Sequence, residues 1–159
     1  GIDLPARDLM EGFAPLPHRC EHAGSVDGVV YVDDSKGTNV AASVTAMTSL
    51  EGRKVVILGG RGKGEDYAPL AEAVAREADA AVLLGEEREA IADALRKAGF
   101  SAIRMAENME EAVLTARELA RPGMTVLLSP ACTSWDMYEN YGQRGDHFCS
   151  IVRGLQEPN

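Results

Sequence analysis

The sequence is poor in basic and aromatic residues and has no long apolar run. Its 16 lysines and arginines face 25 aspartates and glutamates, a formal charge of -9, and aromatic residues make up 5% of the 159 residues. This balance disfavours a broad nucleic-acid or anionic-membrane surface, because both require clustered basic side chains. No apolar run approaches the roughly 18 residues of a membrane span, and the opening GIDLPARDLM lacks the features of a signal peptide. We therefore expect a cytoplasmic protein that binds neither nucleic acid nor a membrane.

Cysteine is also scarce, and the cysteines and histidines do not form a metal-binding pattern. No CxxC pair is present, and the histidines do not complete a zinc spacing. His18 and His22 are four residues apart, which would suit a shared metal on a helix, but Pro17 and the turn-like surroundings argue against a helix there. We expect no metal site and reduced thiols, as is usual in the cytosol. The residues concerned are Cys20, Cys132, Cys149, His18, His22 and His147.

The hydrophobic pattern alternates between short β-branched runs and segments with helical spacing. This alternation is typical of a parallel sheet covered by helices, so we expect a doubly wound, mostly parallel, Rossmann-like α/β fold with helices on both faces. We expect one α/β domain over 27–159, with 1–26 as a lead-in segment of the same domain. The expected strands are 27–34, 53–60, 79–85, 100–106 and 124–130, and the expected helices are 37–50, 66–78, 86–99, 108–122 and 146–155.

Three expected strands end in unusually polar sequence, and the first is VDDSKGTN at residues 32–39. A polar loop with Ser35, Thr38 or Asn39 as helix cap would explain part of it. A cap needs one such residue, whereas this loop also carries two carboxylates and the ammonium of Lys36. Open α/β sheets bind ligands at the carboxyl ends of their strands. The stretch therefore indicates a ligand site.

The second polar strand end, GGRGKGED at residues 59–66, resembles a phosphate loop but fails its requirements. Ile57 stands where that loop needs its first glycine, and Gly64 where it needs Ser or Thr after the lysine. The dinucleotide pattern GxGxxG also fails, at Glu65. What remains is a glycine-rich loop carrying Lys63, which either pairs with a carboxylate or phosphate or is simply solvated.

The third polar strand end, SPACTSWDMYENYGQRG at residues 129–145, combines hydroxyls with aromatic rings. Ser134 either caps the following turn or donates to a ligand. The aromatic residues Trp135, Tyr138 and Tyr141 form either a pocket wall or ordinary packing against the terminal helix. No GxSxG elbow is present, and no base is apparent beside Cys132. The residues alone therefore predict a small-anion site without a complete catalytic machine.

Four stretches resemble the C-terminal domain of the Mur ligases, ATP-dependent enzymes of peptidoglycan precursor synthesis. They are LPHRCE (16–21), DDSKGTN (33–39), LGGRGKGEDY (58–67) and LLSPACTSWDMYENYGQRGDHF (127–148), and they follow the family's order and spacing. LSPA and DSK are shared by several members, whereas the run from Ser134 to Gly145 is more specific to the D-glutamate-adding branch. The resemblance implies that two preceding domains are absent, which fits the Gly1 start and the missing phosphate loop. The isolated domain is then expected to be inactive.

The resemblance also implies the ligands and the roles of individual residues. The ligands would be ATP, D-glutamate and UDP-N-acetylmuramoyl-L-alanine, and Mg²⁺ would be held mainly by the absent central domain. Three positions depart from the family, which usually has Phe at Tyr141, a smaller apolar residue at Trp135 and often Asn at Asp33. The implied roles are nucleotide contact for Arg19 and Asp34, catalysis for Lys36, and D-glutamate binding for Thr38, Lys63, Ser134 and Tyr141.

Two alternatives remain open from the sequence. One is the C-terminal domain of another amino-acid ligase, such as folylpolyglutamate synthase or a sister Mur enzyme. The other is a stand-alone anion-binding module that performs no chemistry. The first predicts activity with L-glutamate or a diamino acid and none with D-glutamate. The second predicts that the domain binds its ligand tightly on its own.

Overall fold

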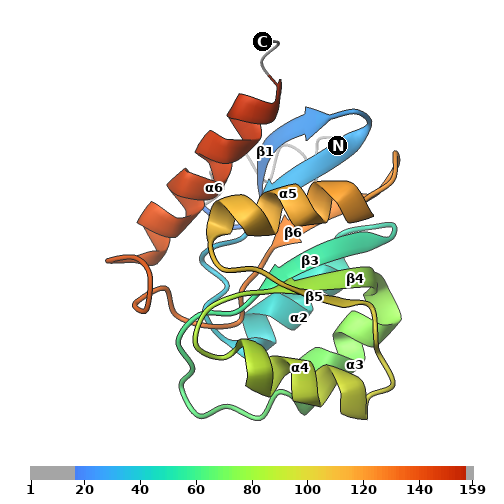
Figure 1. Ribbon diagram of the computed structural model, residues 1–159, viewed down its shortest axis with the longest axis vertical. Coiled ribbons are helices and arrows are strands. Elements are labelled where there is room, and N and C mark those ends of the chain that lie inside the picture. The colour runs from blue at the N-terminus through green and yellow to red at the C-terminus, as the bar shows by residue number, and fades with distance from the viewer. Residues whose placement is uncertain (1–16, 157–159) are drawn as a thin grey trace, which may run out of the picture.

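The structure is a computed structural model that describes residues 17–156. Its centre is a six-stranded sheet with the order β1-β2-β6-β3-β4-β5 (Figure 1). Strands β2, β6, β3, β4 and β5 run parallel to one another, and β1 is antiparallel to β2. The expected mostly parallel α/β sheet is confirmed. The bounds are β1 Glu21–Val26, β2 Val29–Asp33, β3 Lys54–Leu58, β4 Ala78–Leu83, β5 Ile103–Met105 and β6 Thr125–Leu128.

Strand β1 was not predicted, because residues 21–26 were assigned to the lead-in. A two-residue turn joins it to β2, and Val26 pairs with Val29 on the two sides of that turn. Asp27 and Gly28 in that turn have φ angles of 53° and 82°. Such positive values at both positions define the turn that matches the twist of a β-hairpin, and Asp-Gly is a preferred sequence for it. The part of the lead-in that the structure describes is thus joined to the sheet, and residues 1–16 lie outside the described range.

Helices cover both faces of the sheet, as expected (Figure 1). Helices α2, α3 and α4 lie on one face, and α5 and α6 lie on the other. The Asn108 side chain, at the first position of the expected helix 108–122, caps α5 by accepting a hydrogen bond from the Glu111 amide at 2.8 Å. The last helix begins five residues before the predicted start. The bounds are α2 Val40–Ser49, α3 Ala68–Glu77, α4 Arg88–Lys97, α5 Met109–Leu119 and α6 Tyr141–Gln156.

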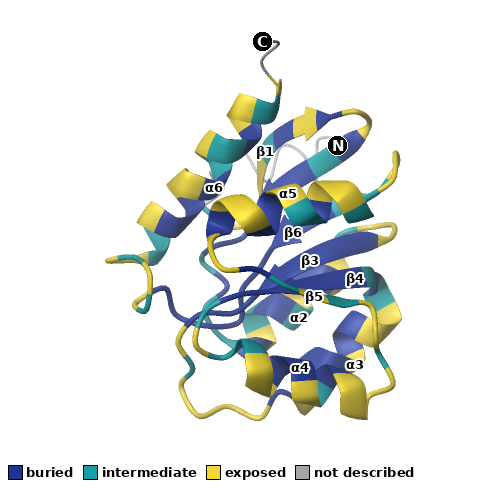
Figure 2. Ribbon diagram, in the orientation of Figure 1, coloured by how far each residue is buried: buried dark blue, intermediate teal, exposed yellow. Residues whose placement is uncertain are grey.

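The core consists of two apolar layers separated by the sheet (Figure 2). On β3, Val56 and Leu58 point toward α2, α3 and α4, whereas Val55 and Ile57 point toward α5 and α6. All four side chains are fully buried. This explains why the strand reads as a continuous apolar run rather than an alternating one. Within residues 17–156, no helix is both long enough and apolar enough to cross a membrane.

Candidate functional site

The three polar strand ends meet at one edge of the sheet because β2, β6 and β3 are neighbours. The Ala131 amide donates to the Gly37 carbonyl at 2.8 Å, which joins the loops after β6 and β2. Arg61 and Thr133 exchange two backbone hydrogen bonds of 3.0 Å, which join the loops after β3 and β6. The shared edge was predicted from the alternation of strands and helices. The exchanged hydrogen bonds hold the loops in one arrangement.

A pocket of about 450 Å³ opens beside the first turns of α2. Arg19, Asp34 and Lys36 line one side of it, so the structure brings together the three residues whose predicted roles are nucleotide contact and catalysis. The other side consists of small residues of α2, which leave room for a ligand. The remaining lining residues are Cys20, Gly37, Ala41, Ala42, Thr45, Ala46 and Ser49.

Both carboxylate oxygens of Asp34 are held by the protein. The Ser129 hydroxyl donates to one of them at 2.5 Å, and the Cys20 amide donates to the other at 3.1 Å. Burial raises the pKa of the Asp34 carboxyl, and the hydrogen bonds from Ser129 and Cys20 act in the opposite direction. The carboxylate is therefore fixed in orientation at the edge of the pocket, where it can accept hydrogen bonds from hydroxyl groups.

Lys36 lies between this pocket and a second one of about 330 Å³ near the start of α6. Its amide donates to the His18 carbonyl at 2.9 Å, which fixes the backbone. Its ammonium lies 3.2 Å from the Tyr141 hydroxyl and 4.7 Å from the centroid of the Tyr141 ring. A cation over an aromatic face is held electrostatically. Lys36, to which the resemblance assigns catalysis, is thus oriented by Tyr141, to which it assigns D-glutamate binding.

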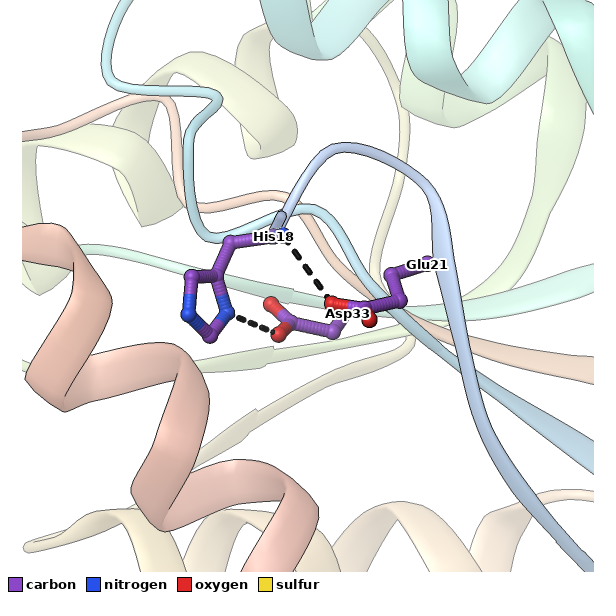
Figure 3. Close-up of side chains that lie close together, drawn as sticks. All are labelled: His18, Glu21 and Asp33. Carbon is purple, nitrogen blue, oxygen red and sulfur yellow. Dashed lines mark hydrogen bonds and ion pairs between the residues drawn. The ribbon is translucent and has the colours of Figure 1, made fainter. Parts of the chain in front are cut away.

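The His18 ring is anchored by Asp33, which is fully buried (Figure 3). His18 Nδ1 lies 2.5 Å from Asp33 Oδ2, and the His18 amide donates to Glu21 at 3.0 Å. These three residues place potential metal ligands within 4.8 Å of one another. The nitrogen and oxygen atoms that would bind a metal are already engaged in hydrogen bonds, including one of 2.9 Å from the Ser35 amide to Asp33. We therefore assign no metal here. His22 lies in strand β1, so it cannot pair with His18 along a helix.

Arg144 is a central residue of the site that sequence reasoning missed. Its guanidinium is buried and donates to the Ser35 hydroxyl at 2.8 Å, the Ser35 carbonyl at 2.7 Å and the Cys132 carbonyl at 3.0 Å. Burial lowers its pKa to about 10, so it remains charged at neutral pH. Arg144, Phe148 and Val152 are four residues apart and all buried, a stripe that would have revealed an inward-facing arginine.

The remaining predicted residues do not line either pocket. Thr38 is half-buried, and Lys63 is exposed on the glycine-rich loop. Ser134 is buried, and its carbonyl rather than its hydroxyl closes the following turn, accepting from the Met137 and Tyr138 amides. The Ser134 hydroxyl, which D-glutamate binding would require, is therefore not used by this turn. D-glutamate binding by Thr38, Lys63 and Ser134 stays a prediction.

Of the aromatic residues after β6, one lines a pocket and one packs against the terminal helix, which are the two alternatives that the sequence left open. The Tyr138 hydroxyl lies 2.6 Å from His147 Nδ1 of α6, so this residue packs on the terminal helix. Tyr141 faces Lys36 and lines the second pocket. Trp135 is 64% exposed and does not pack in the core. The cap of α2 is Asn39, whose side chain accepts from the Ala42 amide at 2.8 Å, which leaves the hydroxyls of Ser35 and Thr38 for other partners.

Comparison with known families and proteins shows the family to which this chain belongs. Residues 18–132 match the family described as Mur ligase, glutamate ligase domain. The chain belongs to the Mur ligase family. The matched range includes the loops that carry Arg19, Asp34, Lys36, Thr38 and Lys63. The Mur ligase resemblance stated from the sequence motifs is confirmed.

Two curated relatives are UDP-N-acetylmuramoylalanine--D-glutamate ligases. The one from Thiobacillus denitrificans is 48% identical over 158 residues, which is 97% of this chain and 33% of the relative. The one from Burkholderia thailandensis is 48% identical over 157 residues, again 97% of this chain and 31% of the relative. The chain therefore spans about a third of the length of the relatives that it matches.

Solved structures of ligases share the fold at lower identity. A murein peptide ligase from Psychrobacter arcticus superposes with a TM-score of 0.64 at 18% identity, covering 97% of this chain and 33% of that one. A folylpolyglutamate synthase from Mycobacterium tuberculosis, complexed with ADP, superposes with a TM-score of 0.61 at 20% identity, covering 85% of this chain and 33% of that one. At these identities the likeness concerns the fold alone.

Proposed function

We propose that this chain is the C-terminal third of an ATP-dependent ligase that joins D-glutamate to UDP-N-acetylmuramoyl-L-alanine in peptidoglycan precursor synthesis. The 48% identity to two ligases named for this reaction supports the proposal. The observation that carries it is the pocket shared by Arg19, Asp34 and Lys36 at the carboxyl edge of the sheet. Residues 27–159 would form the domain with 1–26 as its lead-in, and the N-terminal and central domains would occupy the remaining two thirds of the enzyme.

The reaction has two steps. The carboxylate of the alanyl group attacks the γ-phosphorus of ATP, which gives an acyl phosphate and ADP. The amine of D-glutamate then attacks the acyl carbon, and the tetrahedral intermediate expels inorganic phosphate as the amide forms. The amine loses a proton in this step. Because water competes for the acyl phosphate, closure of this domain over the site would protect the intermediate.

The nucleotide half of the site is proposed at the 450 Å³ pocket. The exposed Arg19 guanidinium suits phosphate oxygens, and Asp34 offers acceptor lone pairs to the ribose hydroxyls. The small residues of α2 give space for the adenosine. The assignment of the nucleotide to this pocket rests on these hydrogen-bond donors and acceptors. A folylpolyglutamate synthase of the same fold is complexed with AMPPNP and Mn, and Mg²⁺ here would be held mainly by the central domain.

The amino-acid half is proposed around Lys36 and the loops that carry Thr38, Lys63, Ser134 and Tyr141. Lys36, as the catalytic residue, would stabilise negative charge as it develops on the acyl group. Lys63 would pair with one D-glutamate carboxylate and Ser134 would donate a hydrogen bond to a carboxylate oxygen. Orienting the amine in line with the acyl carbon supplies several kcal/mol of the barrier by itself. The reaction would take place in the cytoplasm.

Other ligase specificities and a non-catalytic module remain rival functions. Folylpolyglutamate synthase shares the fold at 20% identity, well below the 48% found with the D-glutamate ligases. A sister Mur enzyme would use a different amino acid, and an anion-binding module would need no other domain. The rival functions therefore differ in which amino acid, if any, the reaction requires.

The test is phosphate release by the full-length protein that carries this chain, given ATP, Mg²⁺ and UDP-N-acetylmuramoyl-L-alanine. D-glutamate, L-glutamate and diaminopimelate are compared, with Lys63→Ala alongside the unaltered enzyme. The proposal predicts release that requires D-glutamate and that collapses in the variant at low D-glutamate concentration. Release with another amino acid would reject the specificity, and no release with any of them would favour the binding module.

A further inference from the structure

Glu65 bridges two of the polar loops at the sheet edge. Its Oε1 accepts a hydrogen bond from the Val40 amide, at the first residue of α2, at 2.9 Å. Helix α2 has no acidic residue in its own first turn, so Glu65 supplies both an acceptor and a negative charge from another part of the chain. An anionic acceptor is favoured there because the amide groups of a helix N-terminus carry positive partial charge.

This bond fixes the loop on one side of Lys63, and Arg61 fixes it on the other. Arg61 exchanges two backbone hydrogen bonds of 3.0 Å with Thr133. Only Gly62, Lys63 and Gly64 lie between the two anchors. Gly64 has a φ of 80° and no atom near its Cβ position, so it adds freedom rather than restraint. The position of Lys63 therefore depends on the anchors.

The same hydrogen bond engages the Glu65 carboxylate with α2 rather than with Lys63 in the same loop. Among residues 17–156, Lys63 makes no ion pair within 4.0 Å. A glutamate two residues from a lysine on a glycine-rich loop has the reach to pair with it. By accepting from Val40 instead, Glu65 leaves the ammonium available for a ligand carboxylate.

We propose that Glu65 is a positioning residue that presents Lys63 to the carboxylate of the incoming amino acid. The inference rests on the proposed function and deepens it. Glu65 does not touch the reacting atoms. It acts by holding the loop against α2, so its loss would weaken amino-acid binding without altering the chemical step or nucleotide binding.

The test uses the full-length enzyme and measures kcat together with the KM for D-glutamate and for ATP. Glu65→Ala is expected to raise the D-glutamate KM about tenfold, the effect of losing a hydrogen bond to a charged group, with kcat and the KM for ATP unchanged. Glu65→Gln keeps an acceptor oxygen and is expected to restore most of the affinity. Glu72→Ala removes an exposed carboxylate of α3 and serves as the matched control, with no change in any constant.

Combining the substitution with Lys63→Ala separates positioning from a general structural role. If Glu65 acts through Lys63, Glu65→Ala has no further effect on the D-glutamate KM in the Lys63→Ala background. Hydrogen exchange of the Val40 amide is expected to accelerate in Glu65→Ala. Additive effects, or an equal rise in the KM for ATP, would overturn the inference. An unaltered enzyme that does not use D-glutamate overturns the proposed function and the inference with it, whereas an active enzyme indifferent to Glu65→Ala overturns the inference alone.

Discussion

The Lys36 ammonium lies 3.2 Å from the hydroxyl of Tyr141, although 105 residues separate the two in the sequence. Lys36 follows β2 and Tyr141 opens α6, so the start of the last helix sets where the ammonium lies. The ammonium is also 4.7 Å from the centroid of the ring. The contact thus has two components, a hydrogen bond to the hydroxyl and an attraction to the aromatic face.

Replacing Tyr141 separates these two components. Tyr141→Phe keeps the ring and loses only the hydroxyl, so we expect the D-glutamate KM of the full-length enzyme to change by no more than about threefold, given the small net value of a partly exposed hydrogen bond. Tyr141→Ala removes the ring as well and should raise that KM by more than about tenfold. Steady-state kinetics at saturating ATP measure both. Equal effects of the two substitutions would contradict this account of the contact.

Gly145 lies on the inner side of α6, where a side chain has no room. An added Cβ would collide with His18 Nδ1 and would lie 2.7 Å from Asp33 Oδ2. Gly154, in the same helix, has nothing within 4 Å of its Cβ position. Gly154→Ala should therefore stabilise the domain by about 0.5–1 kcal/mol through helix propensity, whereas Gly145→Ala should destabilise it by about 1–3 kcal/mol through overpacking. Urea denaturation measures both, and the same sign of change for both would contradict the prediction.

Arg144 holds the loop after β2 against the loop after β6 through three hydrogen bonds. Arg144→Ala leaves the Ser35 and Cys132 carbonyls without this partner and should lower the free energy of unfolding by about 3 kcal/mol. Arg144→Lys should recover little, because an ammonium cannot reproduce the planar fork. Arg153→Ala, at an exposed position of the same helix, is the control and should change stability by less than about 0.5 kcal/mol. Full recovery by lysine would show that the charge alone matters.

The Cys20 thiol should react slowly although the residue is exposed. Burial of the thiol and the nearby Asp34 carboxylate raise its pKa to about 11. A raised thiol pKa keeps the group protonated, and only the thiolate is nucleophilic. At pH 8 we expect alkylation by iodoacetamide to be about 100-fold slower than for a cysteine of ordinary pKa, with the rate rising until the pH approaches 11. A rate that levels off below pH 9 would contradict the assignment.

The sequence was most informative where local pattern decides the structure. The expected strand 53–60 and the expected helix start at Asn108 agree with β3 and α5, because both signals depend on neighbours in the chain. Strand β1 was missed although the Asp27–Gly28 pair is a strong hairpin signal. Its positive φ angles are the property that makes this pair a turn.

The candidate site was predicted in part, because its residues come from separate loops. Asp34 and Lys36 stand two residues apart in the loop after β2, and the carboxyl end of such a strand is where open α/β sheets bind ligands, which is why this pair could be anticipated. The contacts of Arg144 and Glu65 could not, since each joins segments whose approach is set by the fold. A charged residue on a helix or in a glycine-rich loop is more often solvated than used in this way.

The most direct test of the central claim is the identity of the product. The full-length enzyme is incubated with ATP, Mg²⁺, UDP-N-acetylmuramoyl-L-alanine and an equimolar mixture of D-glutamate, L-glutamate and diaminopimelate, and the product is analysed by mass spectrometry and chiral amino-acid analysis. We predict a single product that contains D-glutamate. A product that contains L-glutamate or diaminopimelate, or no product from an enzyme that is folded and binds ATP, would contradict the assignment.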